Sequence, residues 1–209
     1  MPIPPPCRAA WAAATLAGLL AAAAPAMVRA ADNANAAVQT LHGVRYEPHA
    51  EVGGQKLRLN GAGTRYKAVF KVYTAGLYLE KPARSLQEIA ALPGPKRMSV
   101  TMLRDIDSSE LGKLFSRGME DNMERAAFSK LVPGVLRMSQ IFTDHKKLLA
   151  GETFTVDWIP RHGTQVTVKG QPQGEPFKEP EFFQALLGIW LGPHPADEQL
   201  KKALLGEAS

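Results

Sequence analysis

Hydrophobic and polar positions repeat with two different periods along the chain, and the changes of period predict the order of its elements. A period of two residues predicts a strand, and apolar positions spaced three and four residues apart predict a helix. On this basis the predicted order is a group of strands, then helices, then a second group of strands, and finally two helices. The predicted strands cover residues 44–52, 64–79, 97–103, 153–160 and 165–170, and the predicted helices cover 85–92, 107–123, a segment after 134, 181–192 and 197–206.

Turn and capping residues add detail to this outline. Gly53-Gly54 predicts a two-residue hairpin, and residues 60–63 (NGAG) predict a break before the long extended segment that starts at Thr64. Ser85 and Glu88 have the spacing of a capping box at a helix start. Because hairpin-length loops join the strands, we expect a largely antiparallel sheet with helices packed on one face, which is a single α+β domain.

The first thirty residues differ in composition from the rest and are typical of a secretory signal. One basic residue, Arg8, precedes an apolar run over 9–24, and the small residues around Arg29 suit cleavage near Ala30. The apolar run is short for a membrane span. We therefore expect export to the periplasm, a flexible lead-in over 31–42, a folded domain over 43–206 and no stable membrane insertion after the signal is removed.

Charge and cysteine content narrow the function classes. Without residues 1–30 the chain has 23 basic and 20 acidic residues, a net charge of +3, and no cysteine. No basic run with interleaved aromatic residues suggests nucleic-acid binding. The five histidines are scattered without zinc-site spacing, and no P-loop, G-x-S-x-G elbow or complete G-x-G-x-x-G is present. We therefore expect no metal, no cofactor and no hydrolase triad.

The segment from Asn60 to Glu80, NGAGTRYKAVFKVYTAGLYLE, contains the candidate chemistry. In one uninterrupted strand Arg65 and Tyr73 would share a face, because both are odd-numbered. A guanidinium keeps its charge when partly buried and presents a fork that matches a carboxylate or an enolate oxygen, and a phenol can add one donor. The pair would suit an anionic or carbonyl oxygen in an apolar cleft, although a solvated strand face explains the same spacing.

The same segment resembles the GxGxR…(F/Y)TxxGxYLE signature of the chalcone isomerase fold. The blocks GQPQGEPF, FFQALLGIWLGPHP and LKKALLG are similar to exported bacterial members of the chalcone isomerase-like family, so the resemblance covers roughly residues 43–206. It implies an open-faced β-sandwich, in which a large antiparallel sheet is covered by a layer of helices with a ligand cleft between them.

The resemblance also implies which residues line that cleft. The family arginine corresponds to Arg65, and the catalytic threonine falls on Tyr73, with Thr74 adjacent. The catalytic tyrosine and asparagine of the plant enzymes fall on Leu111 and Gly118, which have no side-chain donor. Asn122, one helical turn after Gly118, is the nearby candidate to replace the asparagine.

The spacing of Arg65 and Tyr73 is a difficulty for a shared site. Eight residues of straight strand span roughly 26 Å, and no Gly, Pro or Asn in TRYKAVFKVY offers a tight turn. Between the arginine and GLYLE the chain is also about four residues shorter than the plant pattern. Either a bulge or a bend folds this segment, or the two residues do not share one site.

Three hypotheses follow. The first is a non-catalytic binder of a small amphipathic or aromatic carboxylate, such as a fatty acid, because tyrosine at the second position resembles the fatty-acid-binding branch of the family. Its ligand-binding residues would be Arg65, Tyr73, Thr74 and Asn122. The second is an intramolecular lyase or isomerase acting on an enone with a different catalytic set. The third is a periplasmic interaction or scaffold domain, whose sign would be a cleft closed by side chains such as Phe182, Phe183 and Trp190.

Overall fold

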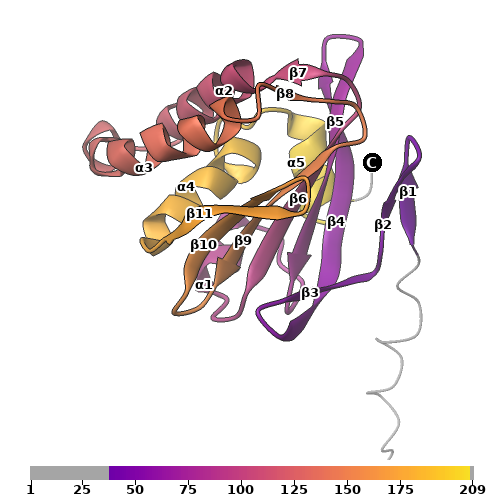
Figure 1. Ribbon diagram of the computed structural model, residues 1–209. Helices are drawn as coiled ribbons and strands as arrows, with labels where there is room; N and C mark the ends of the chain where they lie inside the picture. Colours follow the sequence, from indigo (N-terminus) through magenta and orange to yellow (C-terminus); the bar gives the residue numbers. More distant parts are fainter. Residues whose placement is uncertain (1–37, 208–209) are drawn as a thin grey trace, which may run out of the picture. The chain divides into compact units, whose positions relative to one another are not determined.

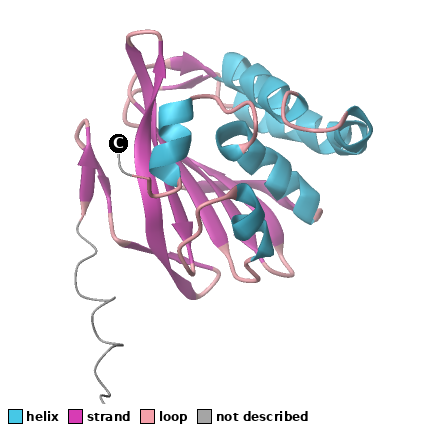
Figure 2. Ribbon diagram, turned by 180° about the vertical axis from the view of Figure 1, so that it is seen from behind, coloured by secondary structure: helices cyan, strands magenta, loops and turns pink. Residues whose placement is uncertain are grey.

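The computed structural model describes residues 38–207 and contains a seven-stranded antiparallel sheet with helices on one face (Figures 1 and 2). The strand order is β11-β10-β9-β6-β5-β4-β3, so strands that follow one another are mostly neighbours. The sheet strands are β3 (His49–Val52), β4 (Gln55–Lys67), β5 (Phe70–Leu79), β6 (Lys96–Met102), β9 (Thr153–Ile159), β10 (Gly163–Val168) and β11 (Gln171–Phe177). The α+β class and the antiparallel sheet are thus as predicted.

Helices α2, α3 and α4 form most of the layer over the sheet (Figure 1), and two small pairs of strands lie outside the main sheet. The hairpin of β1 and β2 packs on the opposite face, where Tyr46 lies against Gly76 of β5. The remaining elements are α1 (Leu86–Ala91), α2 (Ser108–Glu120), α3 (Arg125–Thr143), α4 (Pro180–Leu191), α5 (Glu198–Leu204), β1 (Gln39–Leu41), β2 (Val44–Tyr46), β7 (Ile106–Asp107) and β8 (Lys147–Leu148).

Alternation along the central strands places the core under the helices. On β5 the side chains of Tyr73, Ala75, Leu77 and Leu79 face the helix layer and are buried there. The aromatic centre of this core is Phe115, whose ring contacts those of Phe142, Phe154 and Trp190 with centroids 5.1, 5.7 and 6.0 Å away. Edge-to-face contacts of this kind fill the space between sheet and helices.

The predicted long strand over 64–79 is wrong, because the chain reverses at Ala68 and Val69. Lys67 pairs with Phe70 across this tight turn, and a register irregularity follows between Tyr66 and Arg65. Ala68 adopts a φ of 54°, a conformation that usually requires glycine or asparagine. The turn was missed because its residues do not include the ones that favour such a backbone.

The predicted break at residues 60–63 is also wrong, since β4 runs through it with a register shift between Leu59 and Gly61. The glycines instead allow α5 to approach the strand. A Cβ on Gly61 would lie 2.0 Å from the carbonyl oxygen of Ala203, and one on Gly63 would lie 2.7 Å from Ala203 Cβ. Glycine here serves close packing of a helix on a strand.

Prolines account for two further differences. Helix α3 begins at Arg125 and contains Pro133, whereas the sequence predicted a helix that starts after it. Strand β11 contains Pro172 and Pro176, which obscured it in the sequence; β11 is an edge strand, where proline is tolerated.

The beginning of the described chain also differs from the prediction. The predicted strand over 44–52 divides into β2 and β3, and β1 occupies residues 39–41 of the expected lead-in. The expected signal over 1–30 lies outside the described residues.

Candidate functional site

A small pocket opens where the β4–β5 hairpin, α2 and the loop after α4 meet. Its volume is about 150 Å³, and the two candidate residues Arg65 and Tyr73 both line it. They lie directly opposite one another in the register of β4 and β5, because the turn at Ala68 folds the segment back on itself. The other lining residues are Leu111, Leu114, Phe115, Arg117, Gly118, Asp121, Ile189, His194, Pro195 and Ala196.

Arg65 is half-buried and lies beside Tyr73 at the pocket. Its central carbon lies 5.4 Å from the centroid of the Tyr73 ring, within the range of a cation–π contact. The Nε atom is buried and has no hydrogen-bond partner among the described residues. Leaving such a donor unpaired costs free energy, so an oxygen acceptor placed beside Nε would stabilise the site.

Tyr73 is buried, and its hydroxyl is held by the core beneath the pocket. The indole Nε1 of Trp190 donates a hydrogen bond of 2.8 Å to the Tyr73 oxygen. Burial raises the pKa of Tyr73, and the neighbouring Arg65 charge opposes that effect only in part. The group therefore stays a neutral phenol that accepts from Trp190 and keeps its own proton available for donation.

The positions that lack the expected donors also line this pocket. Leu111 and Gly118, both on α2, belong to its wall, where the resemblance had placed the family tyrosine and asparagine. A Cβ on Gly118 would lie 3.1 Å from the Ile189 side chain, so this position is adapted to close packing against α4. The helix wall therefore presents no hydroxyl or amide at these two positions.

Thr74 and Asn122, the other predicted ligand-binding residues, lie outside this pocket. Thr74 is fully buried on the opposite face of the sheet, where its hydroxyl accepts a 2.8 Å hydrogen bond from Tyr46. Asn122 follows α2 and is occupied by backbone groups: it donates to the carbonyls of Gly118 and His194 and accepts from the His194 amide. Asn122 thus positions the loop that carries His194 without facing the Arg65 pocket.

His194 and Arg117 are pocket residues that the sequence did not predict. His194 follows α4, and the turn signal around it (Gly192, Pro193, Pro195) gave no indication of what the loop would cover. Arg117 forms an exposed pair with Asp121, with 3.7 Å between Nε and the carboxylate. With Arg65 included, the pocket has two guanidinium groups and one carboxylate, which favours an anionic ligand.

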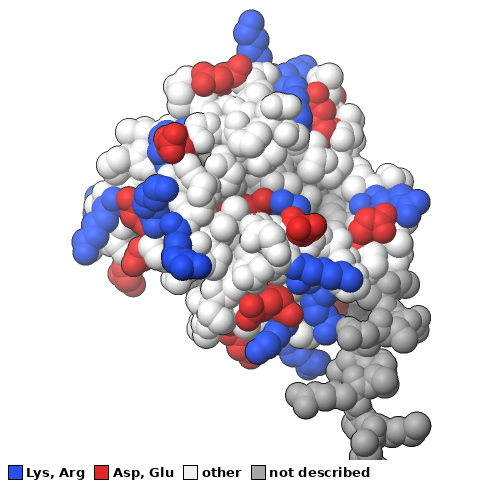
Figure 3. Space-filling view, turned by 60° about the horizontal axis from the view of Figure 1, so that its bottom comes forward, with Lys and Arg blue, Asp and Glu red and all other residues white. Residues whose placement is uncertain are grey.

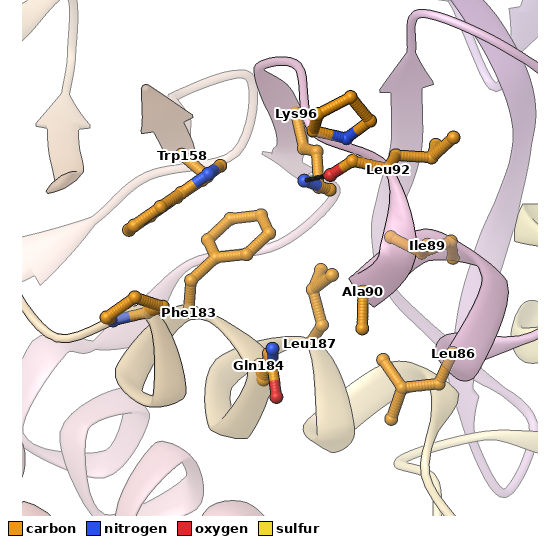
Figure 4. A pocket seen from close by; sticks show the side chains of 11 residues that line it. Leu86, Ile89, Ala90, Leu92, Lys96, Trp158, Phe183, Gln184 and Leu187 are labelled. Atoms are coloured by element: carbon orange, nitrogen blue, oxygen red, sulfur yellow. Dashed lines mark hydrogen bonds between the residues drawn. The ribbon is translucent and has the colours of Figure 1, made fainter. Parts of the chain in front are cut away.

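A second cavity, of about 210 Å³, lies at the opposite end of α4 between α1 and Trp158 of β9 (Figure 4). Lys96 reaches it from β6 but is only 3% exposed, and its Nζ donates to the carbonyls of Leu92 and Gly94. Burial lowers the pKa of Lys96, and the charge of Glu80 partly opposes this. Because the ammonium is hydrogen-bonded to the backbone carbonyls that follow α1, we assign Lys96 a structural role.

On the face shown in Figure 3, Lys and Arg side chains are interspersed with Asp and Glu, and no broad surface of one sign is visible. Within residues 38–207, no helix combines the length and the hydrophobicity that crossing a bilayer requires.

An antiparallel sheet that is covered by helices, with an arginine pocket between the two layers, defines the open-faced β-sandwich class. The chalcone isomerase-like family model matches residues 38–206 of the chain. The chain therefore belongs to the chalcone isomerase-like family.

The structural comparison agrees with this assignment. A crystal structure of a fatty-acid binding protein from Arabidopsis thaliana superimposes with a TM-score of 0.63 and 16% sequence identity, covering 81% of this chain and 96% of that one. At this level of identity the likeness concerns the fold. No curated protein sequence matches the chain at a significant level.

Proposed function

We propose that the protein is a non-catalytic binder of a small amphipathic carboxylate, whose head group is held by Arg65 and Tyr73. The observation that carries this proposal is the buried Arg65 Nε, which has no acceptor within residues 38–207, next to a neutral phenol with a proton to donate. A carboxylate offers two oxygens, one for the guanidinium and one for the phenol. The Arabidopsis thaliana fatty-acid binding protein, which shares this fold, supports the same ligand class.

The composition of the helix wall supports binding over catalysis. Leu111 and Gly118 cannot stabilise developing negative charge or order a water molecule. Loss of a single such donor costs on the order of a hundredfold in rate. Tyr73 does not replace them as a base, because its raised pKa keeps the phenol protonated.

The size of the pocket limits how much of the ligand it encloses. Its volume of about 150 Å³ corresponds to roughly five water molecules at ~30 Å³ each. The aromatic contacts of Phe115 close the space beneath it. We therefore propose that the head group and a few carbons enter the pocket, while a longer chain extends from its mouth.

We also propose that the protein meets this ligand outside the cytoplasm. The signal-like residues 1–30 support this proposal, and removal of that segment would leave a chain that starts at Ala31. Amino-terminal sequencing of protein purified from the periplasmic fraction should give ADNANAAV. A start at Met1 would contradict export by cleavage.

Native mass spectrometry together with calorimetric titration tests the binding proposal. Wild-type protein from the periplasm should carry a co-purifying acid, and Arg65→Gln should be empty. In titrations with a series of saturated carboxylates, Arg65→Gln should weaken binding about 10- to 100-fold, because a charge-assisted hydrogen bond contributes about 1.5–3 kcal/mol. Arg45→Gln is the matched control, since Arg45 is an exposed strand arginine paired with Glu47.

Two results would contradict the proposal. One is the absence of any carboxylate binding to the wild type, and the other is equal binding by wild type and Arg65→Gln. In either case the interaction-domain hypothesis would be favoured, and the burial of Phe182, Phe183 and Trp190 is compatible with it. Turnover of an enone such as naringenin chalcone above its spontaneous rate would favour an isomerase.

A further inference from the structure

The tip of the β4–β5 hairpin exposes apolar side chains at a projecting point of the molecule. Val69 is 83% exposed, Phe70 is 60% exposed and Tyr66 is 37% exposed. Figures 1 and 2 show that this hairpin extends beyond the neighbouring strands of the sheet. Exposed apolar residues that occur together, rather than singly, usually mark a contact surface.

Basic side chains surround this tip, and the hairpin has no acidic residue. Lys67 and Lys71 are exposed next to the turn, and the Arg104 guanidinium lies 5.7 Å from the centre of the Phe70 ring. The sequence contains no Asp or Glu between residues 52 and 79. One carboxylate, that of Asp197, lies at the base of the tip and accepts a 2.9 Å hydrogen bond from the Tyr66 amide, whereas Lys67, Lys71 and Arg104 supply three positive charges. The tip is therefore locally cationic.

We propose that the hairpin tip, defined as Tyr66, Lys67, Val69, Phe70 and Lys71, docks the protein on an anionic lipid bilayer. Val69 and Phe70 would enter the head-group region, where aromatic rings are favoured, and the two lysines would contact lipid phosphates. The turn itself stays at the level of the head groups, because its backbone groups need polar partners. The contact is peripheral and reversible.

A bilayer fits this surface better than a protein partner does. A stable protein interface uses about 20–30 residues on each side, whereas the tip presents three apolar side chains on a narrow projection. A membrane requires no shape complementarity, and a few inserted apolar residues combined with basic ones suffice for peripheral binding. The charge of the tip complements anionic head groups, not an apolar groove.

Docking in this way would bring the pocket to the source of its ligand. Arg65 lines the pocket and lies on β4 four residues before Val69 of the turn, which is at most about 13 Å at 3.3 Å per residue. A carboxylate with an apolar chain partitions into bilayers, so the pocket would exchange its ligand directly with the membrane. This last step rests on the proposed function, whereas the docking itself does not.

Co-sedimentation of the mature chain with lipid vesicles tests the docking. Vesicles of phosphatidylcholine alone are compared with vesicles that also contain phosphatidylglycerol, at low and high salt. The wild type should bind the anionic vesicles, and high salt should weaken the binding because it screens the lysines. Val69→Ser/Phe70→Ser should reduce the partition coefficient at least tenfold, and Lys67→Gln/Lys71→Gln should reduce it several-fold and flatten the salt dependence.

Two controls separate the possible outcomes. Leu136→Ser changes an apolar residue of α3 that is 66% exposed and distant in sequence from the tip, so it should bind like the wild type. Arg65→Gln should also bind vesicles normally, which separates a failure of the docking from a failure of the pocket. Equal binding by wild type and Val69→Ser/Phe70→Ser would overturn the proposal. Self-association that only this double variant abolishes would also overturn it, since a second copy would then cover the tip.

Discussion

At the scale of single residues, the site depends on a backbone conformation that its sequence does not favour. Ala68 holds a φ of 54° at the turn that brings Arg65 opposite Tyr73. An L-residue in this conformation costs about 1–2 kcal/mol relative to glycine. The turn is kept in place by the pairing of β4 with β5 on both sides of it, because this pairing extends over most of both strands.

We expect Ala68→Gly to stabilise the protein by roughly 0.5–1 kcal/mol, since relief of the strained φ exceeds the added entropy of the unfolded chain. Chemical denaturation measures this change. Ala127→Gly, in the exposed face of α3, is the matched comparison and should destabilise by about 1 kcal/mol. Destabilisation by both substitutions would show that the Ala68 backbone is not strained.

Tyr73 links the pocket to the core through Trp190, so its hydroxyl serves stability as well as binding. We expect Tyr73→Phe to lower the free energy of unfolding by about 1–3 kcal/mol, because the buried indole Nε1 of Trp190 loses its hydrogen-bond acceptor. Carboxylate affinity should fall in parallel in calorimetric titrations. Tyr66→Phe removes a hydroxyl from a partly exposed ring and should leave both quantities unchanged. An unchanged stability of Tyr73→Phe would mean that the indole finds another acceptor.

At the scale of elements, close packing of the last helix on the longest strand holds the pocket side of the sheet. Helix α5 lies against Gly61 and Gly63 of β4, and the Asn60 side chain donates to the Leu204 carbonyl. Asp197, which caps α5, also accepts from the Tyr66 amide. The helix therefore supports the same stretch of β4 that carries Arg65.

We expect Gly61→Ala to destabilise the protein by more than about 2 kcal/mol, because a new Cβ would meet the Ala203 carbonyl 2.0 Å away and backbone would have to move. Gly188→Ala, inside α4, provides the contrast. Its Cβ would make an ordinary 3.5 Å contact with Asn122, and the gain in helix propensity should stabilise by up to about 1 kcal/mol. Thermal unfolding measures the stability of both variants relative to the wild type. Equal changes in stability would contradict the close packing proposed for Gly61.

Elements with a clear period or a local cap could be predicted from the sequence, whereas those fixed by tertiary contacts could not. The Ser85 cap was predicted and its side chain accepts from the Glu88 amide. The turn at Ala68 was missed because Ala and Val do not favour a positive φ and the strand pairing on both sides enforces it, and β11 was missed because its prolines are acceptable only at a sheet edge. The location of such an edge is not encoded locally.

The candidate site could likewise be predicted only in part from the sequence. The arginine motif and the residues of α2 could be placed by resemblance, and Arg65, Tyr73, Leu111 and Gly118 do line one pocket. The roles of Thr74 and Asn122 could not be predicted, because each depends on a partner far along the chain. Thr74 faces Tyr46, 28 residues away, and Asn122 binds His194, 72 residues away.

At the scale of the whole molecule, the helices cover one face of the sheet, the short β1–β2 hairpin packs on part of the other, and that side holds buried phenols. Tyr46 lies over β5 with its hydroxyl on Thr74, and burial raises its pKa to about 12. Tyr78 is also buried there, and burial raises its pKa to about 12 as well. In the unfolded chain both would titrate near pH 10. The sheet's outer cover is therefore sensitive to alkaline conditions.

Because these folded-state pKa values lie above the unfolded ones, the stability that the buried phenols contribute is complete below about pH 10 and is lost as the pH rises towards 12. For Tyr46 alone a shift of two units corresponds to about 2.7 kcal/mol at most. We expect the stability of the wild type to fall more steeply than that of Tyr46→Phe between about pH 9 and pH 12. Urea denaturation across this range measures the dependence of the free energy of unfolding on pH for both proteins. Equal dependence would mean that the Tyr46 hydroxyl is exposed to water and not buried beneath the β1–β2 hairpin.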